Sequence, residues 1–185
     1  HSLIDLGVFI HEGEHDVSLL DNIEFIVKSP GVPLDIPFLI EAEKQCIQII
    51  SEIEFAFNFT NSHIIAITGT NGKTTTSHLL WHILKSAGFN VCLAGNVGKS
   101  FSECILENEY SHYVLELSSF QLDNIKKFKP DISIVLNIDN DHLDRYDNDI
   151  NNYVQSKLKI QMNQTEKEKF IYLSEDSNIS PYLST

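Results

Sequence analysis

The sequence predicts an α/β protein with a mostly parallel sheet flanked by helices. Short apolar runs alternate with helical patterns along the chain. Most of these runs are nearly continuous, as in strands that are buried on both faces. One run passes through a glycine-rich turn directly into a helical pattern. In such sheets ligands bind beyond the carboxyl ends of the strands, so we expect the functional residues there.

The first sixty residues contain a strand–helix–strand–helix pattern. Strands are predicted at 23–27 and 47–50, with a Ser-Pro-Gly turn after the first. A helix is expected to follow Pro37. Ser51 is expected to cap a short helix, with Glu54 at the capping-box position. The polar segment 58–63 is interpreted as an interdomain linker.

From residue 64 onward the alternation continues with longer elements. Strands are predicted at 64–68, 91–94, 113–117, 132–138 and 170–173, and helices at 100–106 and 150–160. The helix after the glycine-rich turn is expected to end at Gly88. Its predicted buried face consists of Leu79, Leu80, Ile83, Leu84 and Ala87.

Composition restricts the classes of function. The 185 residues carry a formal charge of −13, which argues against nucleic acid and anionic membranes as partners. Cys46, Cys92 and Cys104 lack metal-type spacing and are interpreted as reduced core thiols of a cytoplasmic protein. No signal peptide or bilayer-spanning run is evident. The missing initiator Met and the end of the chain soon after a strand lead us to expect a piece of a longer protein.

The segment 64–76, IIAITGTNGKTTT, has the pattern of a nucleotide phosphate loop. Gly69 and Gly72 allow the backbone to approach a phosphate, and the N–H groups at the helix start face the anion. Lys73 would reach the terminal phosphates, and the Thr74 hydroxyl would bind Mg²⁺. Ile67 stands where the usual pattern has its first Gly, so the loop is a variant. A tight turn without a ligand is the alternative.

Three further strand ends carry polar residues. Asn96 lies in a Gly-Asn-Val-Gly turn, which could equally be a plain turn. Glu116 lies within an apolar strand; its partner is either a metal ion, which the neighbouring phosphate loop favours, or an ordinary salt bridge. The segment 137–146 clusters carboxylates, His142 and Arg145, and it lacks the Gly and closing Glu of a calcium loop.

The segment 11–15, HEGEH, matches a zinc-protease pattern that requires a helix. Gly13 is central, and no apolar face or third ligand is evident. We therefore interpret His11 and His15 as parts of a polar loop.

The ordered set of motifs resembles the Mur ligases. The matching segments are TGTNGKTT at 68–75, GNVG at 95–98, LELSSFQL at 115–122 and DHLDRY at 141–146, with supporting matches at Ser29-Pro30-Gly31 and Lys157-Leu158-Lys159-Ile160. The resemblance covers nearly the whole chain. It implies a P-loop ATPase domain at 61–185, incomplete here, preceded at 1–60 by the end of a Rossmann-like UDP-binding domain. The C-terminal domain of the family would be absent.

The resemblance also implies an activity, with LELSSFQL indicating the glutamate-adding branch. The expected reaction is the ATP-dependent addition of D-glutamate to UDP-N-acetylmuramoyl-L-alanine through an acyl phosphate, in peptidoglycan precursor synthesis. Two Mg²⁺ ions are expected. We also expect a cytoplasmic monomer that acts on small molecules and binds neither nucleic acid nor membrane.

The roles carried over by the resemblance fall on matching positions. Lys73, His142 and Lys157 would be catalytic, and Lys157 would be carbamylated by CO₂. The nucleotide would contact Gly69, Thr70, Asn71, Gly72, Lys73, Thr74 and Thr75. The muramoyl substrate would contact Gly31, Asn96, Ser118, Gln121 and His142. Metal ligands would be Thr74, Glu116, His142 and carbamylated Lys157.

Three alternatives remain open at this stage. A folylpoly-γ-glutamate synthetase shares the expected fold, although the SSFQL stretch argues against it. An isolated nucleotide-binding module without ligase activity is also compatible with the sequence. A simple phosphate-loop ATPase would hydrolyse ATP without a muramoyl substrate.

Overall fold

The computed structural model describes residues 3–141 and 143–183, which divide into two compact units. The first unit comprises residues 3–26 and 32–49, and the second comprises 27–31 and the chain from 50 onward. The first contains the short helices η1 (Ile4–Leu6) and η2 (Val17–Leu20) and the helix α1 (Pro37–Lys44). Its small core consists of Leu20, Leu39, Ala42 and Ile49.

The predicted elements of the first sixty residues are present with small shifts in their ends. Strands β1 (Phe25–Lys28) and β2 (Gln48–Ser51) pair in a two-stranded sheet. Pro37 begins α1, where its fixed φ and missing N–H cost nothing. The Ser51 hydroxyl accepts a hydrogen bond from the backbone N–H of Glu54 and so caps α2 (Glu52–Phe57).

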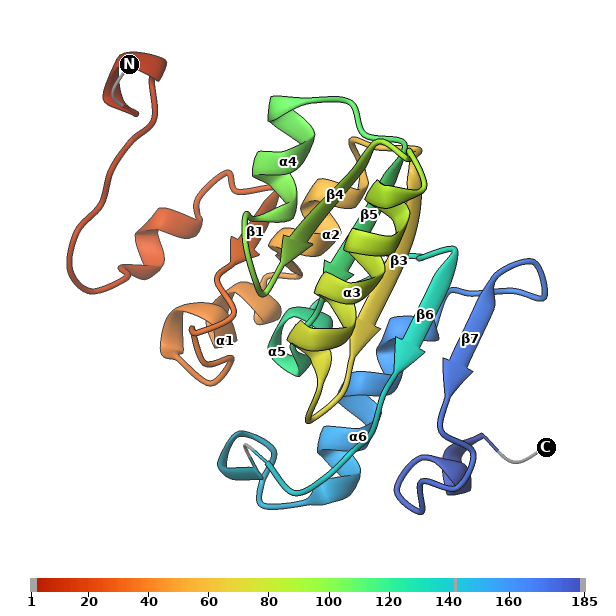
Figure 1. Cartoon of the computed structure of the whole chain (residues 1–185). Helices are drawn as coiled ribbons and strands as arrows, with labels where there is room; N and C mark the ends of the chain where they lie inside the picture. The colour runs from red at the N-terminus through yellow and green to blue at the C-terminus, as the bar shows by residue number, and fades with distance from the viewer. Residues whose placement is uncertain (1–2, 142, 184–185) are drawn as a thin grey trace. The chain divides into compact units, whose positions relative to one another are not determined.

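The second unit is built on a five-stranded parallel sheet, which confirms the predicted fold class (Figure 1). Its strands are β3 (His63–Thr68), β4 (Val91–Gly95), β5 (His112–Glu116), β6 (Ile132–Val135) and β7 (Lys169–Tyr172). Their order across the sheet is β4-β5-β3-β6-β7, and every neighbouring pair is parallel. The phosphate-loop strand β3 is therefore central, flanked by β5 and β6.

Both faces of this sheet are covered by helices. Alternate residues of each strand point to opposite sides, so each strand contributes side chains to both cores. Helix α3 (Lys73–Ser86) covers one face, where Ile67, Val91 and Val114 pack against Leu80 and its neighbours. The opposite face forms the larger core and receives α2, α4 (Phe101–Glu107) and α6 (Ile150–Leu158) (Figure 1). This layering explains the nearly continuous apolar strands.

Short helices complete the second unit. They are α5 (Ser119–Leu122), η3 (Leu143–Arg145), η4 (Lys159–Gln161) and η5 (Ser180–Tyr182). Among the described residues, no helix has both the length and the apolar character needed to cross a membrane.

Four expectations about packing are wrong in detail. Leu79 and Ile83 of α3 are more than half exposed, because α3 turns Leu80, Trp81 and Leu84 toward the sheet instead. The strand predicted at 132–138 ends at Val135, where the chain turns toward the phosphate loop.

The other two differences concern single side chains. Cys46 is exposed, although Cys92 and Cys104 are buried and all three thiols are free. Glu54 does not close a capping box. Its carboxylate instead accepts three hydrogen bonds, at 2.8–2.9 Å, from the backbone N–H groups of Lys126, Lys127 and Phe128.

Candidate functional site

The phosphate loop lies between β3 and α3, at the carboxyl edge of the sheet (Figure 1). Gly69 has φ +152°, and a Cβ there would lie 3.1 Å from the Leu136 Cβ. Gly72 has φ +82° and forms the N-cap of α3. Both positions therefore need glycine, one for close approach and one for its left-handed backbone. The first turn of α3 leaves backbone N–H groups facing the loop, as an anion site requires.

Asn137, which follows β6, holds this loop in shape. Its backbone carbonyl accepts from the N–H of Thr70 at 2.9 Å, and its Oδ1 accepts from the N–H of Asn71 at 2.8 Å. Its Nδ2 donates to the Asn71 carbonyl at 3.1 Å. One side chain thus satisfies both backbone groups of a loop residue, which fixes the loop conformation through β6.

Two lysine side chains meet at one carbonyl of the loop. Lys73 Nζ donates to the carbonyls of Gly69 and Thr70, each at 2.9 Å. Lys157 Nζ, from α6, also donates to the Gly69 carbonyl at 2.9 Å. The structure therefore brings together two residues that are 84 positions apart in the sequence and that were both predicted at the site. Their convergence concentrates positive charge in a chain of strongly negative net charge.

The environment of Lys157 disfavours its ammonium form. The residue is 2% exposed, and Nζ lies 4.5 Å from the centre of the Tyr153 ring. Burial, and next the nearby charge of Lys73, lower the pKa of Lys157 to about 7, while Asp141 and Asp123 oppose the shift. A lysine with this pKa is about half neutral at neutral pH, so its amine can act as a nucleophile.

Glu116 lies at the end of β5, beside Ile67 of β3 in the parallel register. It is 1% exposed, and both carboxylate oxygens accept from neutral groups. Ser77 Oγ lies 3.3 Å from Oε2, and Asn96 Nδ2 donates to Oε1 at 3.1 Å. Ser77 Oγ also lies 3.1 Å from the Thr74 carbonyl, so the carboxylate faces the first turn of α3.

These contacts fit a metal ion beside the phosphate loop. No ion pair involves Glu116 within the described residues, so the salt-bridge alternative finds no support there. A cation would offset the cost of burying a carboxylate whose hydrogen-bond donors are all neutral. Oxygen ligands of this kind suit Mg²⁺. Three or more His, Cys, Asp or Glu side chains do not gather into a metal cluster anywhere in the described chain. His142, predicted as a ligand, lies outside the described residues.

The residues predicted to contact the muramoyl substrate are only partly assembled. Asn96 and Gln121 line one cavity of about 480 Å³, formed by Val27, Lys28, Ser29, Pro30, Glu52, Gly95, Asn96, Ser100 and Gln121. Ser118 is the N-cap of α5 and forms a capping box with Gln121, which occupies the Gln121 Oε1. Gly31 adjoins this set in sequence but does not line the cavity.

The backbone carbonyl of Glu116 in β5 lies directly against Gly95 at the end of β4. Gly95 has φ +106°, and a Cβ there would overlap the Glu116 carbonyl oxygen. The Asn96 N–H donates to that same oxygen at 2.8 Å. Gly95 therefore lets the chain place Asn96 against both the backbone and the side chain of Glu116.

A polar and aromatic cluster joins α5 to α6. Asp123 accepts from Tyr146 Oη at 3.0 Å and from Ser156 Oγ at 2.6 Å. The Tyr146 ring stacks on Phe120 with an interplanar angle of 5°, and the Arg145 guanidinium lies 4.7 Å from the centre of the Phe120 ring. The segments 115–122 and 141–146 are thus fastened together next to the helix that carries Lys157.

Ser77, Lys28 and Asp123 lie at the site but were not predicted. Ser77 contacts Glu116 of β5, Asp123 contacts Ser156 of α6, and Lys28 lines the cavity. Asn137 belongs to the predicted segment 137–146, although its hydrogen bonds to the phosphate loop were not predicted.

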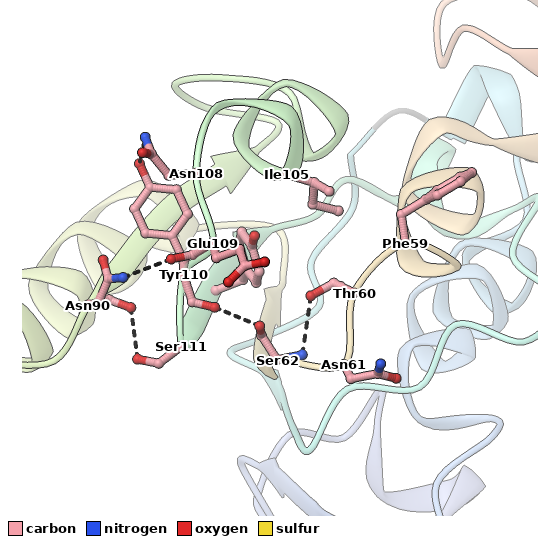
Figure 2. A pocket seen from close by; sticks show the side chains of 11 residues that line it. Phe59, Thr60, Asn61, Ser62, Asn90, Ile105, Asn108, Glu109, Tyr110 and Ser111 are labelled. Atoms are coloured by element: carbon pink, nitrogen blue, oxygen red, sulfur yellow. Dashed lines mark hydrogen bonds between the residues drawn. The ribbon is translucent and has the colours of Figure 1, made fainter.

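A second cavity lies at the opposite edge of the sheet (Figure 2). It measures about 660 Å³, and it is lined by the segments that lead into β3, β4 and β5. Its polar groups bond one another: Ser62 Oγ donates to the Tyr110 carbonyl, and Asn90 Nδ2 donates to the Glu109 carbonyl. This position is remote from the strand ends where a parallel sheet binds ligands.

The HEGEH segment is a loop, as predicted. Residues 11–16 form bends and coil, and they are exposed. His11 Nε2 lies 2.7 Å from the Glu14 carbonyl, a local contact within the segment.

Comparisons with known proteins agree with this architecture. Residues 67–184 match the Mur ligase middle domain. The chain is 48% identical over 170 residues to the UDP-N-acetylmuramoylalanine–D-glutamate ligase of Bacteroides fragilis, covering 92% of this chain and 38% of that protein. It thus spans less than half the length of this relative.

Solved structures show the same fold at low sequence identity. One is a MurF ligase from Thermotoga maritima in complex with ADP, with TM-score 0.56, 20% identity and coverage of 88% of this chain and 48% of that one. Another is a UDP-N-acetylmuramate:L-alanyl-γ-D-glutamyl-meso-diaminopimelate ligase from Neisseria meningitides, with TM-score 0.62, 18% identity and coverage of 98% and 61%. The family match, which spans more than half of the chain, identifies this protein as a member of the Mur ligase family.

Proposed function

We propose that this chain is part of an ATP-dependent ligase that adds D-glutamate to UDP-N-acetylmuramoyl-L-alanine in peptidoglycan precursor synthesis. The observation that carries the proposal is the convergence of Lys73, Lys157 and Glu116 at one phosphate loop. The similarity to D-glutamate ligases supports the choice of substrate. Residues 61–185 would belong to the ATP-binding domain and residues 1–60 to the UDP-binding domain.

The proposed reaction has two steps. An oxygen of the substrate carboxylate attacks the γ-phosphorus of ATP, the bond to the bridging oxygen breaks, and ADP leaves. The amine of D-glutamate then attacks the acyl carbon of the resulting acyl phosphate. Inorganic phosphate leaves, and the amine loses a proton. A carboxylate is a poor electrophile, so phosphorylation supplies the leaving group.

The residues of the loop would neutralise and orient the anions. Lys73 would exchange its two loop carbonyls for the phosphate oxygens, while residues 69–75 would supply backbone N–H groups and hydroxyls. Thr74, Glu116, His142 and carbamylated Lys157 would hold Mg²⁺, with two ions proposed. When bound, Mg²⁺ would neutralise negative charge on the phosphate groups of the nucleotide.

Lys157 is suited to reaction with CO₂. A neutral amine attacks the carbon of CO₂, an N–C bond forms, and one proton is released to give an anionic carbamate. The pKa of about 7 provides the neutral amine without a separate base. The product would replace a buried cation beside Lys73 with an anion, which removes their mutual repulsion.

The substrate would enter beside Asn96 and Gln121. Asn96 already donates to Glu116, so it connects the cavity to the metal site. The Oε1 of Gln121 is used in the α5 cap, which orients its amide group at the cavity wall. Ser118 would hold the Gln121 side chain in place through this cap. Gly31 and His142 are proposed as further substrate contacts. The family resemblance supports a cytoplasmic monomer, and the acidic composition argues against nucleic acid and anionic membranes as partners.

Nucleotide binding is tested first. Isothermal titration of the protein with ADP and Mg²⁺ is expected to show one site. Lys73→Met should weaken binding by about tenfold or more, because a charge-assisted hydrogen bond to phosphate is lost. Lys167→Met is the matched control, since it removes one charge from an exposed position before β7. Equal affinities for both variants would contradict the assignment of the loop.

A substrate panel with the full-length enzyme tests the reaction. Phosphate release is expected only with UDP-N-acetylmuramoyl-L-alanine and D-glutamate together. Turnover with a folate and glutamate would instead favour the folylpoly-γ-glutamate synthetase. Phosphate release without any acceptor would favour a simple ATPase, and nucleotide binding without turnover would favour a binding module.

Carbamylation is tested separately. Lys157→Ala should lose most ligase activity, and an added short carboxylate should restore part of it. Lys159→Ala, two positions along and half-buried, is the control for non-specific rescue. Unchanged turnover of Lys157→Ala would remove the proposal for this lysine.

A further inference from the structure

Two buried thiols lie side by side between β4 and α4. Cys92 belongs to β4 and Cys104 to α4, and their sulfur atoms lie 2.7 Å apart. Both cysteines are free, and their exposed fractions are 9% and 0%. A disulfide bond is about 2.05 Å long, so little movement would bring these sulfurs to bonding distance. The backbone therefore places the pair within reach of a cross-link.

Ordinary core packing does not explain this short distance. Buried cysteines often act only as small apolar side chains. Packing alone favours separations of about 3.5–4.0 Å between non-bonded heavy atoms, and sulfur is larger than carbon. The two thiols are closer than this, so they are crowded as a dithiol. A bond between the sulfurs would relieve the crowding.

The thiol pair lies at one edge of the sheet. β4 is the outermost strand on its side, and the seven-residue helix α4 packs against it. Tyr110, whose side chain interacts with the Cys92 thiol, lines the cavity of about 660 Å³ (Figure 2). Ile105, which follows Cys104, lines the same cavity. A small oxidant can therefore approach through this cavity, or when the edge of the sheet opens locally.

Cys92 is the sulfur expected to react first. Burial raises the pKa of both thiols, that of Cys104 to about 12. The hydrogen bond between the sulfurs lowers the pKa of Cys92 and raises that of Cys104, because the Cys104 S–H stabilises a Cys92 thiolate. Lys99 and Tyr110 also lower the pKa of Cys92, and Glu107 raises it. Since the thiolate attacks oxidants, the reaction should begin at Cys92 and be slow at neutral pH.

We propose that Cys92 and Cys104 are an oxidation site at which hydrogen peroxide forms a reversible disulfide. The Cys92 thiolate attacks one oxygen of the peroxide, and the O–O bond breaks to release hydroxide. The Cys104 sulfur then attacks the sulfur of the resulting sulfenic acid, and the S–O bond breaks to release a second hydroxide. Each hydroxide takes up one thiol proton. The two thiols lose two electrons, and one peroxide becomes two water molecules.

The disulfide would fasten the edge of the sheet. It would close a loop of about 13 residues, for which the chain-entropy model lowers the equilibrium constant of unfolding by about a hundredfold. The closed loop contains Asn96, which donates to Glu116. The assignment does not depend on the ligase reaction. Under the proposed function, oxidation would restrict a segment that carries a substrate residue.

Peptide mapping of the full-length protein tests the site. The protein is treated with hydrogen peroxide, denatured, blocked with iodoacetamide and digested with trypsin without reductant. Trypsin cuts after Lys99, between the two cysteines, so the disulfide would join peptide 86–99 to peptide 100–126. The joined peptide should have the summed mass less two hydrogen atoms. It should be absent before treatment, and dithiothreitol should remove it.

The exposed Cys46 reports whether the oxidant was active. Cys104→Ala should give no joined peptide. Urea unfolding is measured in a Cys46→Ser background, where oxidation should lower the equilibrium constant of unfolding by about a hundredfold. The double variant Cys46→Ser, Cys104→Ala is the matched control. Its stability should not rise with peroxide, although any other oxidised residue is still present.

Three results would overturn the assignment. Recovery of both thiols in alkylated form, with Cys46 oxidised, would show that peroxide does not act on the pair. A sulfinic acid at Cys92 without the joined peptide would show that the two sulfurs cannot bond. A joined peptide without a gain in stability would show that the disulfide forms only in unfolded molecules.

Discussion

Replacing Lys157 with Met should change how the stability of the fold depends on pH. Met has a similar volume and no charge, so the variant lacks the buried titrating group. In the native protein the pKa of Lys157 is lowered from 10.5 to about 7, first by burial and then by the charge of Lys73. A pKa shift of this size corresponds to a cost of about 5 kcal/mol for holding the protonated lysine in the folded state, at about 1.4 kcal/mol per pKa unit.

The sign follows from proton binding in the two states. Below pH 7 the lysine is protonated both folded and unfolded, and the folded state carries the whole cost. Between pH 7 and 10.5 the unfolded chain binds a proton that the folded chain does not, so this group makes stability rise with pH. The stability advantage of Lys157→Met over wild type should therefore shrink by about 2 kcal/mol from pH 7 to pH 9. The lost bond to the Gly69 carbonyl shifts this advantage by a constant amount.

Urea unfolding measures this difference. Wild type and Lys157→Met are compared at pH 6, 7, 8 and 9 without nucleotide, in buffers freed of CO₂ so that no carbamate forms. Lys167→Met, which is exposed, should run parallel to wild type at every pH. A constant difference between Lys157→Met and wild type from pH 7 to 9 would refute the lowered pKa and its cause.

Three other perturbations have defined outcomes. Gly95→Ala should destabilise the fold by about 3 kcal/mol, measured by urea unfolding, because its Cβ would overlap the Glu116 carbonyl at a positive φ; a loss below 1 kcal/mol would contradict this packing. Glu54→Ala should cost about 3–5 kcal/mol in the same assay, since three backbone N–H groups lose a carboxylate; a loss below 1 kcal/mol would contradict it. Iodoacetamide at pH 8 should label one cysteine, the exposed Cys46, in the folded protein, because burial raises the pKa of Cys104 to about 12; labelling of all three without denaturant would disprove this.

The sequence predicted most of the fold because the relevant signals are local. The strand ending at Thr68, the glycines at 69 and 72 and the helix after them follow from spacing alone. The Ser51 cap is equally local. Glu54 shows the limit of such reasoning: its position suggests a capping box, but three N–H groups from a loop 72–74 residues away form stronger, charge-assisted bonds.

Residues that depend on strand order could not be predicted. Asn137 can shape the phosphate loop only because β6 lies next to β3, and spacing does not reveal this order. Leu79 and Ile83 fit the spacing of an apolar helix face, but the face that packs against the sheet includes Trp81 and leaves these two residues exposed.

The hydrogen bonds from Asn137 to the phosphate loop have a consequence for the thermodynamics of nucleotide binding. Ordering a flexible backbone costs about 1–2 kcal/mol for each residue. A loop that already holds its bound-like conformation avoids most of this entropy loss when the ligand arrives. Removing these hydrogen bonds would therefore weaken nucleotide affinity, because more backbone entropy would be lost on binding. Asn137 itself need not contact the nucleotide for this effect.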